Sequence, residues 1–389
     1  MRSAKTSVVA ILFLTLFISS WLAGCGPTNG LPPLVGEFLY IANEADGVIS
    51  EYSINTATGA LTSVGPFNAL PGGGLFLMAV HPTNEFIYAP DDVDSTVLGF
   101  DIGDGGFSGL IFNRNSDAPA DNGTRAVAIT PNGRFLYATN SGGTDAEVSE
   151  YSINLKTGVL TSLGFAHTGQ IPFGVTVEST GRFAYVVNFF DRTVSQYIVQ
   201  ANGTLATNGT PLSLSFDLTS EPELIATELV GSARLPSTCA YVTDDGLGVV
   251  HELQIDASTG LLSDLGNVDA MGKPFGIAAH PTGRFIYTAN PKSNSISVFT
   301  QLAELKGTCT ITLTSQVTAS AAEVTDLSGP ISIAVEPSGK FAYTANSSDG
   351  TVGEYSIDSG TGALTAIGEV NTETPPNPGS VPISAVTTH

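Results

Sequence analysis

The stretch EYSINTATGALTSVG, from Glu51 to Gly65, is repeated almost unchanged at two other places in the chain. EYSINLKTGVLTSLG begins at Glu150, and EYSIDSGTGALTAIG begins at Glu354. In each copy, two short runs of alternating apolar residues flank a Thr-Gly dipeptide, whose glycine supplies the positive φ that a tight hairpin turn requires. The stretch therefore predicts two antiparallel strands joined by a short turn, and its recurrence predicts a repeat fold.

A second, shorter phrase sets the period of this repeat. It consists of two apolar residues, a tyrosine, two small residues and an Asn or Asp, and it recurs about every 50 residues, a period typical of propeller blades. Its tyrosines are Tyr40, Tyr88, Tyr137, Tyr185, Tyr241, Tyr287 and Tyr343. Since each unit contains four short strand-like segments, we predict an all-β fold, a seven-bladed β-propeller with four-stranded blades.

The ends of the repeat region predict how the ring closes. PISAVTT, from Pro382 to Thr388, matches the first strand of a blade, as in PISIAVE from Pro330 to Glu336. The first unit begins instead with a second strand, at Glu37. We therefore expect the C-terminal strand to pair into the first blade, which removes an open sheet edge. Residues 37–389 would then form a single propeller domain.

The first 24 residues have the features of a secretory signal peptide. Arg2 and Lys5 precede an apolar stretch that ends in Leu-Ala-Gly-Cys, with the cysteine at Cys25. This ending resembles the bacterial lipobox, which implies cleavage before Cys25 and a lipid anchor on its sulfur; an uncleaved membrane anchor is the alternative. Residues 25–36 then form a short Pro/Gly tether. We expect a lipid-anchored protein of the cell envelope, at the outer membrane, at the cell surface or in the periplasm.

The charge balance restricts the partners of the protein. The chain has 14 basic and 36 acidic residues, a net charge of −22. A surface this negative repels phosphate backbones, so we expect no nucleic acid partner, and membrane contact only through Cys25. We expect a monomer. Cys239 and Cys309 could form a disulfide in this compartment, but they belong to different blades and different strands, so we predict two buried free thiols.

The full blade pattern points to a known family. The pattern P-x-G-I-A-x-x-P-x-G-R-F-x-Y-x-x-N, followed by V-S-x-Y-x-I-D-x-x-T-G-x-L, resembles lactonase-type seven-bladed propellers. That family includes 6-phosphogluconolactonases and muconate-lactonizing-type enzymes. It carries a Pro-His-x-His run near blade four, where this chain has Gln170 to Phe173, and an Asp-Arg pair in the next loop, which Asp191 and Arg192 match. The resemblance implies Arg192 as the donor to a developing oxyanion and Asp191 as the base.

Other candidate residues lie where the repeat is broken. Arg125 occupies a position of the first strand that is Phe or Ile in other blades, so it could bind an anion or pair with a nearby Asp. The loops after the tyrosine strands carry acids that could bind a ligand or Ca²⁺, or simply cap solvated turns; four of them are Asp91, Asp92, Asp244 and Asp245. No histidine spacing typical of a metal site occurs, so apart from Ca²⁺ we expect no metal or cofactor. The segment 210–236 is interpreted as a blade-specific insertion.

Three functions are consistent with these features. Because the two histidines are missing, the leading hypothesis is a lipid-anchored binding module for a protein or glycan, with a degenerate active site. The alternative is a lactonase, a carboxylic ester hydrolase that acts on sugar lactones. The third is a structural module stabilised by Ca²⁺.

Overall fold

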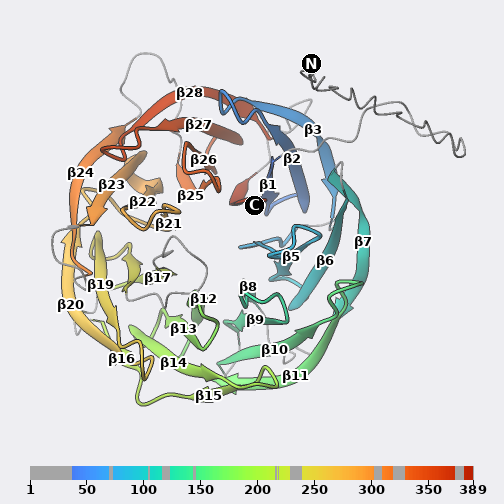
Figure 1. The fold of residues 1–389 in the computed structure, drawn as a ribbon, viewed down its shortest axis with the longest axis vertical. Helices are drawn as coiled ribbons and strands as arrows, with labels where there is room; N and C mark the ends of the chain where they lie inside the picture. The colour runs from blue at the N-terminus through green and yellow to red at the C-terminus, as the bar shows by residue number, and fades with distance from the viewer. Residues whose placement is uncertain are drawn as a thin grey trace, which may run out of the picture. The chain divides into compact units, whose positions relative to one another are not determined.

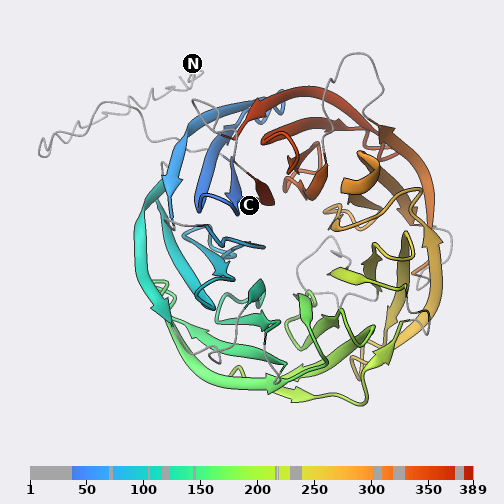
Figure 2. The same cartoon turned by 180° about the vertical axis from the view of Figure 1, so that it is seen from behind.

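The computed structural model describes residues 37–69, 73–103, 106–115, 123–142, 146–214, 217, 219–227, 239–301, 309–318, 329–372 and 381–388. In this part the chain forms seven antiparallel sheets arranged in a ring (Figures 1 and 2). The predicted all-β, seven-bladed propeller is therefore confirmed. The signal peptide, Cys25 and the tether lie outside the described residues and stay predictions. Among the described residues, no helix is long and apolar enough to span a membrane.

Each blade runs from an innermost strand at the central channel to an outermost strand on the circumference (Figure 1). Blade 1 consists of β29 (Pro382–Thr387), β1 (Glu37–Asn43), β2 (Val48–Ile54) and β3 (Leu61–Asn68). Blade 2 consists of β4 (Ala79–Val80), β5 (Phe86–Asp91), β6 (Thr96–Gly103) and β7 (Gly106–Asn115). Blade 3 consists of β8 (Thr124–Ile129), β9 (Phe135–Asn140), β10 (Glu147–Ile153) and β11 (Leu160–His167). Blade 4 consists of β12 (Pro172–Val177), β13 (Phe183–Asn188), β14 (Thr193–Val199), β15 (Leu205–Thr207) and β16 (Leu212–Ser213). Blade 5 consists of β17 (Pro222–Thr227), β18 (Cys239–Asp244), β19 (Val249–Ile255) and β20 (Leu262–Asp269). Blade 6 consists of β21 (Gly276–Ala279), β22 (Phe285–Asn290), β23 (Ser295–Gln301) and β24 (Ile311–Thr318), and the 3₁₀ turn η1 (Pro291–Ser293) lies between β22 and β23. Blade 7 consists of β25 (Pro330–Val335), β26 (Phe341–Asn346), β27 (Thr351–Ile357) and β28 (Leu364–Asn371).

The ring closes as the sequence predicted. β29 pairs antiparallel with β1, with Tyr40 opposite Val386. The backbone N–H of Phe38 also donates to Oγ1 of Thr388 at 2.8 Å. Blade 1 is therefore built from both ends of the propeller, and β1 is not left as an open edge.

The repeated residues hold each blade to the next. In the stretch at Glu354, the glutamate accepts a hydrogen bond at 2.9 Å from the backbone N–H of Leu61 in the neighbouring blade. The tyrosine of the shorter phrase makes a second bond: the hydroxyl of Tyr343 donates to the carbonyl of Gly59 in the neighbour's Thr-Gly turn at 2.9 Å. The equivalent tyrosine bonds of other blades are Tyr88 to Gly158, Tyr137 to Gly203, Tyr185 to Gly260 and Tyr287 to Gly362. The repeated stretch is therefore architectural.

A third contact, at the joints through Gly59, Gly203, Gly260 and Gly362, explains the glycine of the turn. Gly59 has φ +78°, and a Cβ there would lie 2.3 Å from the ring of Phe341 in the preceding blade. Gly203 and Phe135 form the same close contact between blades 3 and 4. The aromatic residue two before the tyrosine therefore packs directly on the next blade's turn.

The joint between blades 5 and 6 corrects the prediction for the two cysteines. Cys239 replaces the aromatic residue of the joint, and Cys309 replaces the turn glycine of the next blade. The two form a disulfide with a Cα–Cα distance of 5.2 Å. The prediction of two free thiols was therefore wrong. Different strands of different blades meet at each joint, which a comparison within single blades does not show.

Candidate functional site

Seven residues at equivalent positions, one from the innermost segment of each blade, lie at one end of the central channel; we call them the mouth ring. In this ring, Phe173 packs edge-on against Phe76 at 5.8 Å and Phe275 at 5.7 Å. Next to the ring, residues from the innermost segments of all seven blades line a cavity of about 170 Å³. The members of the mouth ring in blade order are Ile383, Phe76, Arg125, Phe173, Glu223, Phe275 and Ile331.

Arg125 is a member of the mouth ring, and its guanidinium is paired there. Its Nη1 lies 3.3 Å from Oδ2 of Asp92, and its Nε donates to Oγ of Ser141 at 3.2 Å. The guanidinium carbon lies 4.8 Å from the centre of the Phe76 ring, a cation–π contact. Of the two interpretations, the pairing with an Asp is the one observed. The side chain remains 31% exposed, so a ligand at the mouth can still reach it.

The two acids of blade 2 have different roles. Asp91 is buried, and its Oδ1 accepts hydrogen bonds at 3.0 Å from the backbone N–H groups of Val93 and Asp94. It is therefore a turn-capping residue. Burial raises the pKa of Asp91. Burial also raises the pKa of Asp92, although the neighbouring Arg125 opposes this shift.

Asp244 is an anchor inside blade 5. It accepts hydrogen bonds from Oγ of Ser220 at 2.5 Å, the N–H of Glu221 at 2.8 Å, the N–H of Leu247 at 2.9 Å and Nε2 of His251 at 3.1 Å. Burial raises the pKa of Asp244, but the bonds from His251 and Ser220 outweigh it and leave the pKa below its usual value. An ionised Asp244 thus fixes the loop that leads into β17.

Blade 5 departs from the repeat at this point. Where it has Asp244 and His251, blades 1, 3, 4 and 6 have an asparagine whose amide donates to a serine on the next strand, at 2.8–3.0 Å; the pairs are Asn43 with Ser50, Asn140 with Ser149, Asn188 with Ser195 and Asn290 with Ser297. An asparagine amide nitrogen cannot accept the bonds from Ser220 and His251. The carboxylate is therefore required by the additional donors in blade 5.

Glu223 is the residue that sequence reasoning missed. It belongs to the mouth ring, its side chain is buried, and its Oε2 has no hydrogen-bond partner among the described residues. Burial, reinforced by the negative charges of Asp245 and Glu221 and opposed by Lys292, raises the pKa of Glu223 to about 8. The segment that contains β17 breaks the spacing of the repeat, so the sequence pattern does not align Glu223 with the innermost strands of the other blades. The proline before it, equivalent to Pro172 and Pro330, was the available signal.

The lysines Lys292 and Lys273 already have hydrogen-bond or ion-pair partners. Lys292, on η1 of blade 6, forms an ion pair with Asp245 of blade 5. Lys273 donates from Nζ to the carbonyl oxygen of Gly246 at 2.5 Å. In the described ranges, no group of three His, Cys, Asp or Glu side chains is placed to hold a metal ion, so Ca²⁺ binding stays a prediction with no residues to assign to it.

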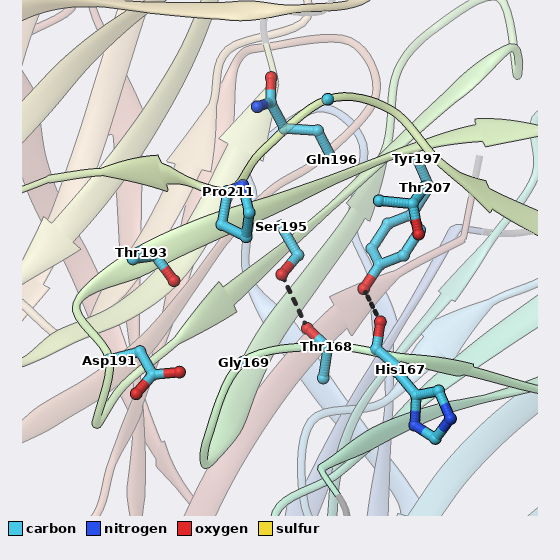
Figure 3. A pocket seen from close by; sticks show the side chains of 11 residues that line it. His167, Thr168, Gly169, Asp191, Thr193, Ser195, Gln196, Tyr197, Thr207 and Pro211 are labelled. Carbon is cyan, nitrogen blue, oxygen red and sulfur yellow. Dashed lines mark hydrogen bonds between the residues drawn. The ribbon is translucent and has the colours of Figure 1, made fainter.

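The pair Asp191 and Arg192 lies on the loop between β13 and β14. Oδ2 of Asp191 accepts a hydrogen bond at 2.8 Å from the N–H of Gln170, which ties this loop to the one before β12. Arg192 has φ +57° and lies near Asp217, whose pKa is lowered mainly by Thr219 and to a lesser extent by Arg192. Asp191 lines a pocket between blades 3 and 4 (Figure 3), and Arg192 is not among the residues that line it.

Comparisons with known proteins agree with this architecture. The sequence profile of the family described as Lactonase, 7-bladed beta-propeller, matches residues 36–215 and 127–378. The chain belongs to the lactonase family of seven-bladed β-propellers. A 6-phosphogluconolactonase of Serratia proteamaculans is 33% identical to this chain over 141 residues, which are 35% of this chain and 42% of that protein. One of Pectobacterium atrosepticum is 26% identical over 260 residues, 64% of this chain and 71% of that protein.

The alignment to the Serratia protein spans 42% of its length, and those to 6-phosphogluconolactonases of Formosa agariphila and Pectobacterium carotovorum each span 47% of theirs. Solved structures cover a larger share of both chains. The periplasmic gluconolactonase of Pseudomonas aeruginosa superposes with a TM-score of 0.69 at 14% identity, over 91% of this chain and 99% of that one. A Lactobacillus plantarum protein gives a TM-score of 0.72 at 17% identity, over 91% and 99%. At these identities the likeness shows the fold alone.

Proposed function

We propose that this lactonase-family propeller hydrolyses lactones at the mouth ring, with Glu223 as the general base. The observation that carries the proposal is the buried carboxyl group of Glu223, with a pKa of about 8, in a ring position that is apolar in most other blades. A carboxyl group whose pKa lies near neutral is suited to accept and return a proton during one reaction.

The proposed reaction needs one proton acceptor and one positive charge. The ionised Glu223 takes a proton from a water molecule as the water oxygen bonds to the lactone carbonyl carbon. The carbonyl π electrons move to oxygen and form an oxyanion. When the carbonyl re-forms, the ring C–O bond breaks, and the proton on Glu223 passes to the departing ring oxygen. The product is the open-chain hydroxy acid, and Glu223 is ionised again.

Lys292 is the cation best placed to stabilise the oxyanion. It is 61% exposed, and its charge acts on Glu223, where it lowers the pKa. Arg125 lies on the other side of Phe173 in the mouth ring and stacks on Phe76. We assign Lys292 to the oxyanion and Arg125 to the orientation of the substrate's polar groups. The pair Asp191 and Arg192, implied by the family resemblance, is the alternative base and donor.

The charges at the mouth favour an uncharged substrate. Arg125 is paired with Asp92, Lys292 with Asp245, and Lys273 with a backbone carbonyl. The chain as a whole has a net charge of −22. A phosphate group would meet acids in excess and cations that already have partners. We therefore propose an unphosphorylated sugar lactone as substrate, in contrast to the phosphorylated substrate in the names of the relatives above.

The test is hydrolysis of glucono-1,5-lactone, followed as acid release above the spontaneous rate. We expect turnover by the wild type, slower turnover of the 6-phosphorylated lactone, and a loss of about 10²-fold or more in Glu223→Gln. Glu85→Gln, an exposed glutamate at the turn before β5, is the matched control and should retain full activity. Equal rates for Glu223→Gln and wild type would contradict the role of Glu223. Loss of activity in Arg192→Ala alone would favour the alternative pair.

The binding-module hypothesis rests on a different observation. The segment Gln170 to Phe173 carries no histidine, and its loop is tied to Asp191 instead. If no lactone is hydrolysed by the wild type while the domain captures a specific protein or glycan, the binding module is correct and the hydrolase proposal is wrong.

A further inference from the structure

A pocket of about 560 Å³ lies at the outer edge of the ring between blades 3 and 4; we call it the seam pocket. One wall is the end of β11 with the two residues that follow, and the opposite wall is β14 with the segment between β15 and β16 (Figure 3). Its volume falls in the range of small-molecule sites. Apart from Asp191, its lining shares no residue with the proposed catalytic site or with its alternative pair.

The seam pocket exists because the outermost strand of blade 4 is interrupted. In the neighbouring blades this strand is continuous, as in β11 (Leu160–His167) and β20 (Leu262–Asp269). In blade 4, β15 ends at Thr207 and β16 begins at Leu212; Asn208 still donates its backbone N–H to Gln196 of β14 at 2.8 Å, and residues 209–211 lie outside both strands. Gly209 and Pro211 of this segment form part of the pocket wall.

One side chain holds this wall in place. Gln196 occupies the position of the joint glutamates, and its Oε1 accepts the N–H of Leu262 in blade 5 at 2.6 Å, as Glu150 does for Leu205. Its Nε2 in addition donates to the carbonyl of Thr210 at 2.8 Å. A glutamate could make the first bond but not the second. The change from Glu to Gln in this blade therefore serves the pocket wall and leaves the joint intact.

The floor of the seam pocket is made of hydroxyl groups. Thr193, Ser195 and Tyr197 alternate along β14 and so point to the same face. Oγ of Ser195 is buried and hydrogen-bonded to Nδ2 of Asn188 at 2.9 Å and to Oγ1 of Thr168 at 3.0 Å. The buried hydroxyl of Tyr197 donates to the carbonyl of His167 at 2.8 Å and ties β14 to the end of β11 (Figure 3). Oγ1 of Thr193, which is half-buried, accepts from Nδ2 of Asn188 at 2.9 Å, and its own proton remains available to a ligand.

The ends of the pocket carry an acid and two rings. Asp191 and His167 lie at opposite ends of the row of hydroxyls (Figure 3). Nδ1 of His167 lies 3.6 Å from Oε1 of Glu147. Beside it the ring of Phe165 is 53% exposed and meets the imidazole edge-on at 5.4 Å. No lysine or arginine is among the described residues that line the pocket.

We propose that the seam pocket binds a neutral saccharide unit. A sugar ring offers hydroxyls that both donate and accept, which matches Asp191, Thr193 and Thr207, and an apolar face that can lie on the exposed ring of Phe165 beside the pocket. Asp191, Glu147 and the net charge of −22 disfavour anions. An apolar ligand would cover the polar groups of Asp191, Thr193 and Thr207 without bonding to them. The site is independent of the mouth ring and of the proposed hydrolysis.

The test uses D-glucose, D-galactose and D-mannose, with D-gluconate as the anionic comparison, titrated into the protein and followed by ligand-observed NMR. We expect saturable binding of at least one neutral hexose and at least tenfold weaker binding of gluconate. Gln196→Glu, which keeps the bond to Leu262 but loses the bond to Thr210, should weaken binding about tenfold. Glu150→Gln, the reciprocal change at the joint between blades 3 and 4, should leave binding unchanged.

A second variant guards against misfolding of Gln196→Glu. Thr207→Val retains the shape of a residue that lines the pocket and removes its hydroxyl, and we expect about fivefold weaker binding. Ser63→Ala, at the same position of the outermost strand in blade 1, is its control. If no neutral hexose binds saturably, if gluconate binds as well as a hexose, or if Thr207→Val binds like the wild type, the proposal is wrong.

Discussion

Blades 4 and 5 share one backbone plan but differ in the chemistry of their inner halves. At the mouth ring, blade 4 places Phe173 and blade 5 places Glu223. Behind it, blade 4 has the neutral pair Asn188 and Ser195, whereas blade 5 has Asp244 and His251. Equivalent positions of the repeat therefore hold the apolar Phe173 in blade 4 and the carboxyl group of Glu223 in blade 5. Behind Glu223, the ionised Asp244 fixes the loop that leads into its strand. Function is to be sought in such differences between blades.

The largest expected effect concerns the joint after blade 5. The disulfide between Cys239 and Cys309 joins residues 70 positions apart, and a loop of this length constrains the unfolded chain by about 4 kcal/mol. The double variant Cys239→Ala, Cys309→Ala should lose about that much stability in urea unfolding. The joint after blade 4, between Phe183 and Gly260, depends on packing and should be unaffected by reductant. A wild-type midpoint insensitive to reductant would contradict the prediction.

The second prediction concerns the pH dependence of stability. The ordinary pKa of a glutamate is 4.5, and burial raises that of Glu223 to about 8 in the folded state. Between these values the unfolded chain releases a proton that the folded protein retains, so stability falls as pH rises, by about 1.4 kcal/mol per pH unit. Glu223→Gln should remove this slope in urea midpoints measured from pH 5 to 8, and Glu85→Gln should not. An unchanged pH slope in Glu223→Gln would count against a raised pKa of the buried Glu223 carboxyl group.

The same pKa predicts the pH profile of activity. A general base acts only when ionised, so kcat/KM for the lactone should rise about tenfold per pH unit below pH 8 and level off above it. Initial rates corrected for spontaneous hydrolysis at each pH provide the measurement. A profile that is flat from pH 6 to 9 would exclude Glu223 as the base while leaving its pKa untouched.

A smaller effect is expected when blade 5 is made more like blade 4. Asp244→Asn removes a charge that contributes to the raised pKa of Glu223, and it cannot accept the bonds from both Ser220 and His251. We expect a loss of about 1–3 kcal/mol in stability and a rate profile shifted to lower pH. Asn188→Asp in blade 4 is the reciprocal change. An unshifted profile with a normal loss of stability would limit Asp244 to a structural role.

The smallest effect should come from one tyrosine bond between the two blades. The hydroxyl of Tyr185 in blade 4 donates to the carbonyl of Gly260 in blade 5 at 2.8 Å. Tyr185→Phe should reduce the free energy of unfolding by about 1 kcal/mol. Lactone hydrolysis should be unaffected. A loss of activity in Tyr185→Phe at full stability would contradict the assignment of the repeated tyrosines to architecture.

The sequence predicted those features that recur in every blade. The tyrosine phrase and the stretch at Glu51 predicted the number of blades, their strands and the closure of the ring, because each copy satisfies the same backbone requirements. Features that depend on contacts between blades could not be predicted in this way. The disulfide joins two positions that become neighbours only at a joint, and Asp244 became an anchor only through Ser220 and His251. Glu223 was missed because its strand follows an irregular connection.

The closure of blade 1 has a consequence for the order of folding. The bond from Phe38 to Thr388 spans 350 residues, so the hairpin of β1 and β2 must wait for the last strand of the ring. During synthesis, an early part of the propeller is therefore exposed for longest and is completed last. A chain cut before residue 382 would keep β1 as an unprotected edge, open to pairing with a second chain. The interval between making β1 and making β29 is thus the period in which this protein is most exposed to aggregation.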